Sequence, residues 1–176
     1  MEKPETVYNG TTLRVERYPV GKGKKREYFE RVTSPDSVMI IPILKDGRLL
    51  IERQFRHSIG KYLYELPAGR MEAGEDPWQT AHRELEEETG YKAMKMKFLL
   101  SSYPSPGHDT EVMRVYLATD LARGKTHKDP NEIISTRAMT AGELLHLIKN
   151  GRIPDMKTIA GILLYLSVYG NASKIH

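Results

Sequence analysis

The chain has 176 residues, of which 39% are hydrophobic and 28% are charged, and this length and balance favour one soluble globular domain. It contains no cysteine, which excludes disulfides, thiolate metal sites and a cysteine nucleophile. The net charge of +4 suits an anionic ligand but is too small to indicate nucleic acid. The N-terminal residues show no signal-peptide pattern, and no apolar run is long enough for a membrane span. We therefore expect a cytoplasmic protein with no membrane partner.

Strand patterns begin near the N-terminus. Thr11–Tyr18 and Arg26–Val32 predict two strands on either side of a basic, glycine-rich turn. The segment Ser34-Pro35-Asp36 then breaks the pattern. We therefore assign residues 1–36 to an N-terminal β-hairpin extension and residues 37–176 to the main domain.

The main domain opens with the apolar run Val38–Leu44, which predicts a strand that is buried on both faces. The turn signal Asp46-Gly47 predicts that the next strand, Leu49–Arg53, forms a hairpin with it. Four further segments read as strands: Tyr62–Glu65, Lys95–Ser102, Met113–Ala118 and Ile133–Met139.

Two helices are predicted in the last third of the chain. Thr140 and Glu143 have the spacing of a capping box, and Asn150-Gly151 is suited to end the helix that they begin. The other helix begins at Asp155 and carries apolar residues at helical spacing. Because most strands precede the helices and do not alternate with them, we predict the α+β class.

A third helix, Pro77–Thr89, carries the candidate chemistry. Asp76 is a favourable N-cap with Gln79 at the third helical position, and Gly90 is suited to a left-handed C-cap. The helix should turn one side toward the core, formed by Trp78, Ala81 and Leu85.

The same helix places three carboxylates, those of Glu84, Glu87 and Glu88, on one face. Like charges at this spacing repel, and acidic groups near a helix C-terminus also oppose the helix dipole. Arg83 can pair with Glu87 but cannot balance all of these charges. Taken alone, the helix is compatible with a solvated acidic face or with a bound cation, and hard divalent cations prefer oxygen ligands.

The wider segment Gly69–Tyr91 decides between these alternatives, because it fits the pattern G-x5-E-x7-R-E-U-x-E-E-x-G-U without a gap. The fixed positions are held by Gly69, Glu75, Arg83, Glu84, Glu87, Glu88 and Gly90. This pattern is the Nudix box, so the chain resembles the Nudix hydrolases. The resemblance implies a mixed β-sheet core sandwiched between α-helices, and hydrolysis of a diphosphate that is linked to another moiety.

The resemblance also implies a metal site. Glu84 and Glu88 would be the main ligands, Glu87 would lie beside them, and the backbone carbonyl of Ala68 would complete the site. Arg83 would orient the glutamates. The expected cofactor is Mg²⁺, with Mn²⁺ as a possible substitute, because such metals neutralise phosphate charge and activate a water.

Two glutamates outside the helix belong to the same implied machinery. Glu75 would brace the turn into the helix. Asp129-Pro130-Asn131-Glu132 matches a late acidic loop, which makes Glu132 a candidate general base or metal ligand. A solvent-exposed glutamate without a role is the alternative for Glu132, and the base would then be Glu87 or a metal-bound hydroxide.

Outside the box, the chain resembles the ADP-ribose pyrophosphatase branch in Gln54-Phe55-Arg56, Glu65–Gly69, Ser105-Pro106-Gly107 and Thr110-Glu111. His108 departs from this branch, where phenylalanine is common, and the late loop is less acidic than usual. By resemblance, the substrate-binding candidates are Arg26, Arg56, Glu65, Ser105 and Glu111. A surface or structural role is the alternative for Arg56 and Glu65.

The resemblance further implies a homodimer, because relatives form swapped dimers through the N-terminal hairpin, and Arg26 would reach the neighbouring subunit's site. The expected reaction is metal-dependent hydrolysis of ADP-ribose or a similar nucleoside diphosphate sugar, which gives AMP and a sugar phosphate. The alternatives are another Nudix substrate, such as a different nucleotide sugar, a dinucleotide cofactor or capped RNA, and a nucleotide-sensing Nudix domain without activity.

Overall fold

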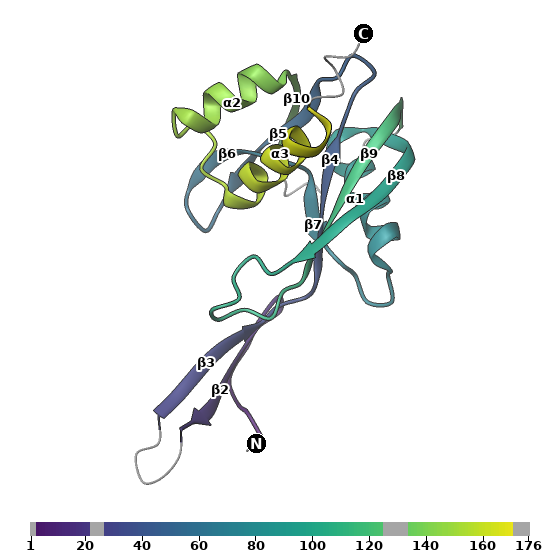
Figure 1. Ribbon diagram of the computed structural model, residues 1–176. Coiled ribbons are helices and arrows are strands. Elements are labelled where there is room, and N and C mark those ends of the chain that lie inside the picture. Colours follow the sequence, from purple (N-terminus) through teal and green to yellow (C-terminus); the bar gives the residue numbers. More distant parts are fainter. Residues whose placement is uncertain (1–2, 22–26, 125–133, 171–176) are drawn as a thin grey trace.

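The computed structural model describes residues 3–21, 27–124 and 134–170, and the account that follows concerns these residues. Figure 1 shows a body of sheets and helices from which a narrow extension projects. The strands are β1 (Glu5–Asn9), β2 (Arg14–Val20), β3 (Glu27–Thr33), β4 (Ser37–Pro42), β5 (Leu49–Arg56), β6 (Lys61–Glu65), β7 (Ala68–Arg70), β8 (Tyr91–Ser102), β9 (Met113–Arg123) and β10 (Ile134–Met139). The helices are α1 (Pro77–Thr89), α2 (Ala141–Lys149) and α3 (Met156–Tyr169).

The extension is a three-stranded antiparallel sheet in the order β1-β2-β3. The predicted hairpin corresponds to β2 and β3, and the prediction missed β1. All five residues of β1 are exposed, which explains why this strand left no hydrophobic pattern in the sequence. The sheet is held by the buried carboxylate of Glu16, which accepts hydrogen bonds from Arg31 Nε at 2.8 Å and Thr33 Oγ1 at 3.2 Å. The Arg31 hydrogen bond lowers the pKa of Glu16.

Two hydrogen bonds fasten the extension to the loop between β8 and β9. The backbone N–H of Val32 donates to the carbonyl of His108, and the N–H of Thr110 donates to the carbonyl of Val32. The side chain of Ser34 also donates to Asp109 at 3.0 Å. The loop that contains Ser105 therefore runs along the base of the extension.

The body contains two sheets. One is mixed, in the order β7-β4-β9-β8, with β4 and β9 parallel; the other is antiparallel, in the order β10-β5-β6. The turn at Asp46-Gly47 forms as predicted, and the hairpin across it is short: Ile43, just after β4, bridges Leu49 antiparallel, and β4 and β5 do not pair further. The two strands diverge after the turn into different sheets.

The strand β4 is buried on both faces, as its apolar run predicted. Val38 and Ile40 pack in the cluster that includes Ala81 and Leu85 of α1. Met39 and Ile41 pack in the other cluster, with residues of α2 and α3. The mixed sheet therefore lies between α1 on one face and α3 on the other, and α2 packs beside α3 (Figure 1).

The helix boundaries agree with the capping signals. Asp76 and Gln79 form the predicted capping box of α1, and Gly90 ends the helix with a left-handed φ of 72°. Thr140 and Asp155 cap α2 and α3 as predicted. Among the described residues, no helix is long and apolar enough to cross a membrane.

One expectation for α1 was wrong. Ala81 and Leu85 are fully buried, but Trp78 is 53% exposed. Trp78 belongs to the first turn of the helix, and its ring lies against that of His82 at a centroid distance of 4.0 Å. The apolar side of the helix therefore meets the sheet only from its second turn onward.

Candidate active site

The last two turns of α1 turn two carboxylates inward. Glu84 is 9% exposed and Glu88 is 3% exposed, so they do not form the solvated acidic face that the helix alone allowed. The backbone N–H of Ala68 donates to Glu88 Oε2 at 3.0 Å. Gly69 lies against the Glu84 carboxylate so closely that a Cβ at this position would overlap with it. The strand β7 and the helix therefore form one tightly packed, oxygen-rich corner.

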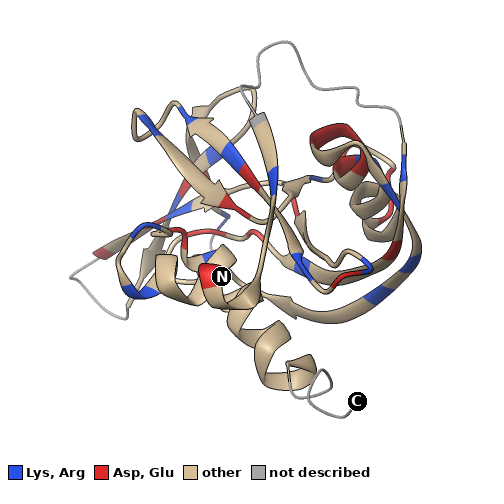
Figure 2. Ribbon diagram, turned by 90° about the horizontal axis from the view of Figure 1, so that it is seen from above, with Lys and Arg blue, Asp and Glu red and all other residues tan. Residues whose placement is uncertain are grey.

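Arg83 is the electrostatic centre of this corner. Its guanidinium contacts Glu75 at 2.9 Å, Glu84 at 2.8 Å and Glu87 at 3.1 Å, and it also donates to the carbonyl of Arg70 at 3.1 Å. The pairing with Glu87 is the one predicted from the sequence. The hydrogen bonds from Arg83 lower the pKa of Glu75 to about 2, and the pKa of Arg83 is raised in turn. Figure 2 shows the acidic segments of the helix in red.

A cavity of about 460 Å³ opens in front of Glu84 and Glu88. Basic side chains from two strands, Arg56 and Arg70, also line it. Arg56 forms a two-pronged ion pair with the buried Glu65, at 2.7 and 2.6 Å, and this hydrogen bonding raises the pKa of Arg56. Such a site combines carboxylates that can hold a cation with fixed guanidinium groups that can bind phosphate.

A second cavity of about 370 Å³ adjoins the first, with which it shares Arg56 and Arg70. Its lining extends to Glu111, whose carboxylate accepts a hydrogen bond from the Ser37 hydroxyl, and to Lys157 at the start of α3. Polar side chains thus continue from the box glutamates along one side of the molecule.

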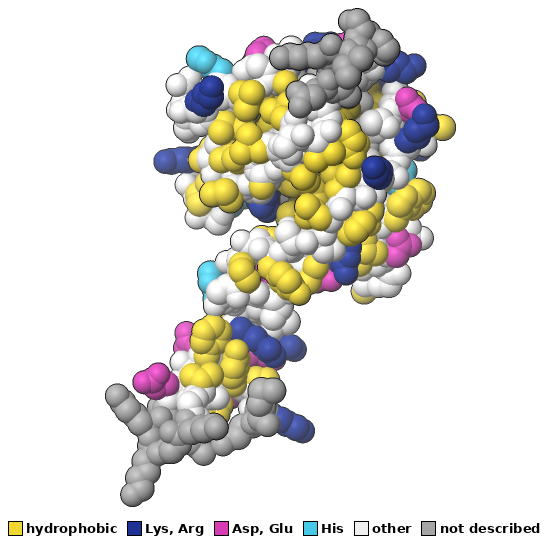
Figure 3. Space-filling model, in the orientation of Figure 1, with side chains coloured by type: hydrophobic (Ala, Val, Ile, Leu, Met, Phe, Trp, Pro, Cys, Tyr) yellow, Lys and Arg dark blue, Asp and Glu magenta, His cyan; other side chains and the backbone are white. Residues whose placement is uncertain are grey.

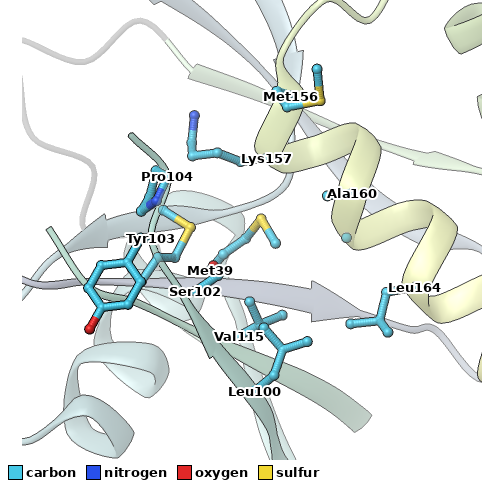
Figure 4. A pocket seen from close by; sticks show the side chains of 12 residues that line it. Met39, Leu100, Ser102, Tyr103, Pro104, Val115, Met156, Lys157, Ala160 and Leu164 are labelled. Atoms are coloured by element: carbon cyan, nitrogen blue, oxygen red, sulfur yellow. The ribbon is translucent and has the colours of Figure 1, made fainter. Parts of the chain in front are cut away.

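A third hollow of about 340 Å³ is mostly apolar and lies between α3 and the strands β8 and β9. It shares Met113 and Lys157 with the second cavity. Figure 4 shows Tyr103, Pro104 and Lys157 gathered at one end of this hollow, with Leu164 near the other.

The structure does not bring every candidate residue to these cavities. Ser105 is half-buried, its hydroxyl contacts Nε2 of His108 at 3.2 Å, and it does not line either cavity beside the box. Arg26 and Glu132 lie outside the described residues. Seven other candidates line one or both of the adjoining cavities: Arg56, Glu65, Ala68, Arg83, Glu84, Glu88 and Glu111. Glu87 lines neither cavity, but it contacts Arg83.

Among the cavity residues that the sequence reasoning missed are Gln54, Arg70 and Lys157. Gln54 stands in the stretch that resembled the pyrophosphatase branch, and that context was the available signal. Arg70 and Lys157 carried no signal, because long-range folding alone brings α3 beside β7.

The donor set fits a hard divalent cation. Within the described part of the chain, no three acidic or histidine side chains gather closely enough to hold a metal by themselves. The corner does supply two inward carboxylates beside the backbone of Ala68 and Gly69. The atoms that these groups can offer to a metal are oxygens. Mg²⁺ commonly takes one or two carboxylates and completes its shell with waters and substrate phosphates. Glu84 and Glu88 match that requirement.

Comparison with known proteins identifies the class. The family model for the NUDIX domain matches residues 33–160. The methanol dehydrogenase activator of Bacillus methanolicus is 35% identical over 166 residues, which cover 91% of this chain and 88% of the relative. An ADP-ribose pyrophosphatase of Bacillus subtilis (strain 168) is 36% identical over 146 residues, which cover 82% of this chain and 77% of the relative.

A solved structure described as an ADP compounds hydrolase superposes with a TM-score of 0.85 over 99% of this chain and 98% of that chain. Its sequence identity of 23% makes it a likeness of fold. The chain therefore belongs to the Nudix hydrolase family, which confirms the resemblance found in Gly69–Tyr91. Members of this family generally need a divalent metal ion.

Proposed function

We propose that the chain hydrolyses the diphosphate of ADP-ribose, or of a similar nucleoside diphosphate sugar, to AMP and a sugar phosphate. The observation that carries the proposal is the packing of Glu84 and Glu88 against the β7 backbone, in a cavity that also presents Arg56. Relatives that cover most of this chain are named ADP-ribose pyrophosphatases. A cysteine-free chain suits a reducing compartment, so we propose a cytoplasmic location.

Each side chain has a distinct task in this reaction. Glu84 and Glu88, with the carbonyl of Ala68, would hold Mg²⁺ or Mn²⁺, which supplies charge neutralisation at the diphosphate and an activated water. Arg83 fixes the orientation of Glu84 and Glu87 through its ion pairs. Arg56, held by Glu65, presents its guanidinium to the phosphates in a fixed direction.

The sugar moiety has a separate place in the proposal. Glu111 and Lys157 line the second cavity, which continues from the phosphate site. Carboxylate oxygens accept hydrogen bonds from ribose hydroxyls, so Glu111 is the candidate sugar contact. Ser105 and Arg26 remain proposed substrate contacts on the basis of the family resemblance.

A substrate panel tests the proposal. ADP-ribose, other nucleotide sugars, FAD, NADH, diadenosine polyphosphates and capped RNA are compared by kcat/KM with Mg²⁺ and with EDTA. We expect the highest kcat/KM for ADP-ribose, AMP as a product, and no turnover in EDTA. A higher kcat/KM for a dinucleotide or for capped RNA would overturn the substrate assignment, and binding without turnover would indicate a nucleotide sensor.

We propose that Glu132 is the general base. A carboxylate that already binds a cation is a poor proton acceptor, because the cation stabilises its ionised form, so a separate base is useful. The Glu132→Gln variant should lower kcat by ~10²–10⁴, which is typical of a general acid–base group, and should change substrate Kd little. A fall in kcat of less than tenfold would point to Glu87 or to a metal-bound hydroxide, and a collapse of metal affinity would make Glu132 a ligand.

We also propose that residues 1–36 form an arm through which the chain assembles as a homodimer. The arm carries exposed apolar side chains on all three strands, including Val7, Val20 and Phe29. Figure 3 shows apolar atoms on the projecting extension as well as across the adjoining face of the body. Isolated exposed apolar residues are ordinary, but a cluster on a projecting sheet indicates a surface that is covered by a partner.

Light scattering tests the dimer. We expect a mass of two chains, against 20.1 kDa for one chain. The Phe29→Asp variant should shift the mass toward one chain, whereas Met94→Asp, an equally polar change at an exposed position of β8, should not. A mass of one chain for the unaltered protein at working concentration would contradict the proposal.

A further inference from the structure

Gln54 has an unusual position in the first cavity. It lies on β5, the central strand of the antiparallel sheet, and is only 6% exposed. Its side chain lines the same cavity as Glu84 and Glu88, yet within the described part of the chain its carbonyl oxygen Oε1 has no hydrogen-bond partner. Since a buried acceptor without a partner destabilises the folded protein, its presence needs an explanation.

The strand geometry fixes where this oxygen can act. Side chains alternate along β5, so Gln54 and Arg56 lie on the same face of the sheet. The backbone of Gln54 is held on both sides, opposite Leu63 of β6 and opposite Ile134 of β10. Gln54 therefore stands on a rigid element, and its unpartnered oxygen is not the result of a loose loop.

Two arginines of the cavity wall are already engaged with carboxylates. Arg56 pairs with Glu65 through two hydrogen bonds. Arg83 is shared among Glu75, Glu84 and Glu87. Because no described group donates to Gln54 Oε1, we look for its donor in what enters the cavity. The diphosphate oxygens cannot serve, because they are acceptors themselves.

We propose that Gln54 Oε1 accepts a hydrogen bond from a water of the hydrated divalent cation that Glu84 and Glu88 hold. The inference rests on the proposed function, and it makes Gln54 a positioning residue for the metal and its water. Mg²⁺ keeps several waters when it binds through one or two carboxylates, and these waters need acceptors. Groups that hydrogen-bond to the immediate ligands typically contribute 10–100-fold to metal affinity.

The opposite orientation of the amide makes a different prediction. If Nε2 faces the cavity, Gln54 donates to the diphosphate and acts on the substrate. Loss of Gln54 would then raise KM and leave the affinity for metal unchanged. The two orientations are therefore separable by measuring metal affinity in the absence of substrate.

The experiment titrates Mn²⁺ into the substrate-free full chain, followed by electron paramagnetic resonance, for the wild type and three variants. Gln54→Met keeps the volume and removes the oxygen, so Mn²⁺ affinity should fall about 10–100-fold. Gln54→Glu keeps an acceptor and adds charge, so it should bind Mn²⁺ at least as tightly as the wild type. Leu63→Met, at the paired position of β6, is the matched control and should bind like the wild type.

The melting temperature of the metal-free protein is the second measurement. Because Gln54→Met removes a buried acceptor that has no partner, its metal-free melting temperature should equal or exceed that of the wild type. Mn²⁺ should then raise the melting temperature of Gln54→Met by less than it raises the melting temperature of the wild type. This combination distinguishes lost metal positioning from damage to the fold.

Two results would overturn the inference. One is an Mn²⁺ affinity of Gln54→Met within twofold of the wild type. The other is a KM raised at least tenfold with unchanged Mn²⁺ affinity, which would make Gln54 a phosphate donor. Failure of the proposed function looks different, because the unaltered chain would then neither bind Mn²⁺ nor cleave ADP-ribose.

Discussion

The Glu88→Gln variant is expected to lose almost all turnover and to keep its fold. Glu88 is buried and accepts a hydrogen bond from the N–H of Ala68, and a glutamine side chain can accept the same bond with its carbonyl oxygen. The amide lacks the charge that a divalent cation requires. Charge neutralisation by the metal contributes several kcal/mol in the transition state, so kcat/KM should fall by about 10³–10⁵.

Glu86→Gln is the matched control, because Glu86 is a glutamate of the same helix that pairs with Lys92 at 3.2 Å, away from the cavity. It should retain kcat/KM within a few fold of the wild type. The metal-free melting temperature of Glu88→Gln should equal or slightly exceed that of the wild type, since one like charge is removed. Near-normal kcat in Glu88→Gln would show that the metal is held elsewhere.

The Arg83→Met variant is expected to lose both stability and activity. Arg83 pairs with Glu75, Glu84 and Glu87, and its loss removes the guanidinium that contacts the largely buried Glu84. Breaking a fully buried pair costs about 3–5 kcal/mol. Because the side chain of Arg83 is 23% exposed, we expect the free energy of unfolding to fall by roughly 2–3 kcal/mol. Activity should also fall, because Glu84 loses its fixed orientation.

The pH dependence of this loss identifies its cause. Arg83 depresses the pKa of folded Glu75 from 4.5 to about 2, so the pair stabilises the protein above the unfolded pKa and ceases to do so as pH falls through the folded pKa. The difference in unfolding free energy between the wild type and Arg83→Met should have its largest value at pH 7. It should decrease as the pH falls from about 4.5 to about 2. Denaturant unfolding at several pH values measures it.

Arg48→Met is the control for the stability measurement, because Arg48 forms an exposed pair with Asp46 at 2.6 Å. Because solvent screens exposed pairs, their contribution to stability is small, and this variant should unfold nearly like the wild type. If the loss in Arg83→Met were the same at pH 7 and pH 3, ion pairing would not be its source.

Local signals in the sequence predicted local structure well. The boundaries of α1 follow from Asp76, Pro77 and Gly90, each of which acts within its own turn of helix. The box residues around Arg83 came together because most of them belong to the same helix. Features of this kind need no knowledge of the rest of the chain.

Features that depend on distant contacts were not predictable in this way. The turn at Asp46-Gly47 is real, yet the separation of β4 and β5 into two sheets depends on pairing with β9 and β10, far along the chain. The position of Ser105 beside the extension rests on hydrogen bonds to Val32, more than 70 residues earlier. Trp78 is helical as predicted but exposed, because burial depends on what lies beneath each turn.

The contact between Gly69 and Glu84 bears on how such a chain can diverge. Any larger residue at Gly69 requires Glu84 to move, and Glu84 is tied to Arg83, so a single change there disturbs binding, packing and charge together. A substitution in the second cavity disturbs fewer of these interactions at once, because Glu111 lies in a loop and Lys157 in the first turn of α3. New substrate preferences are therefore expected to evolve at Glu111 and Lys157, while the corner of Gly69 and Glu84 is inherited unchanged.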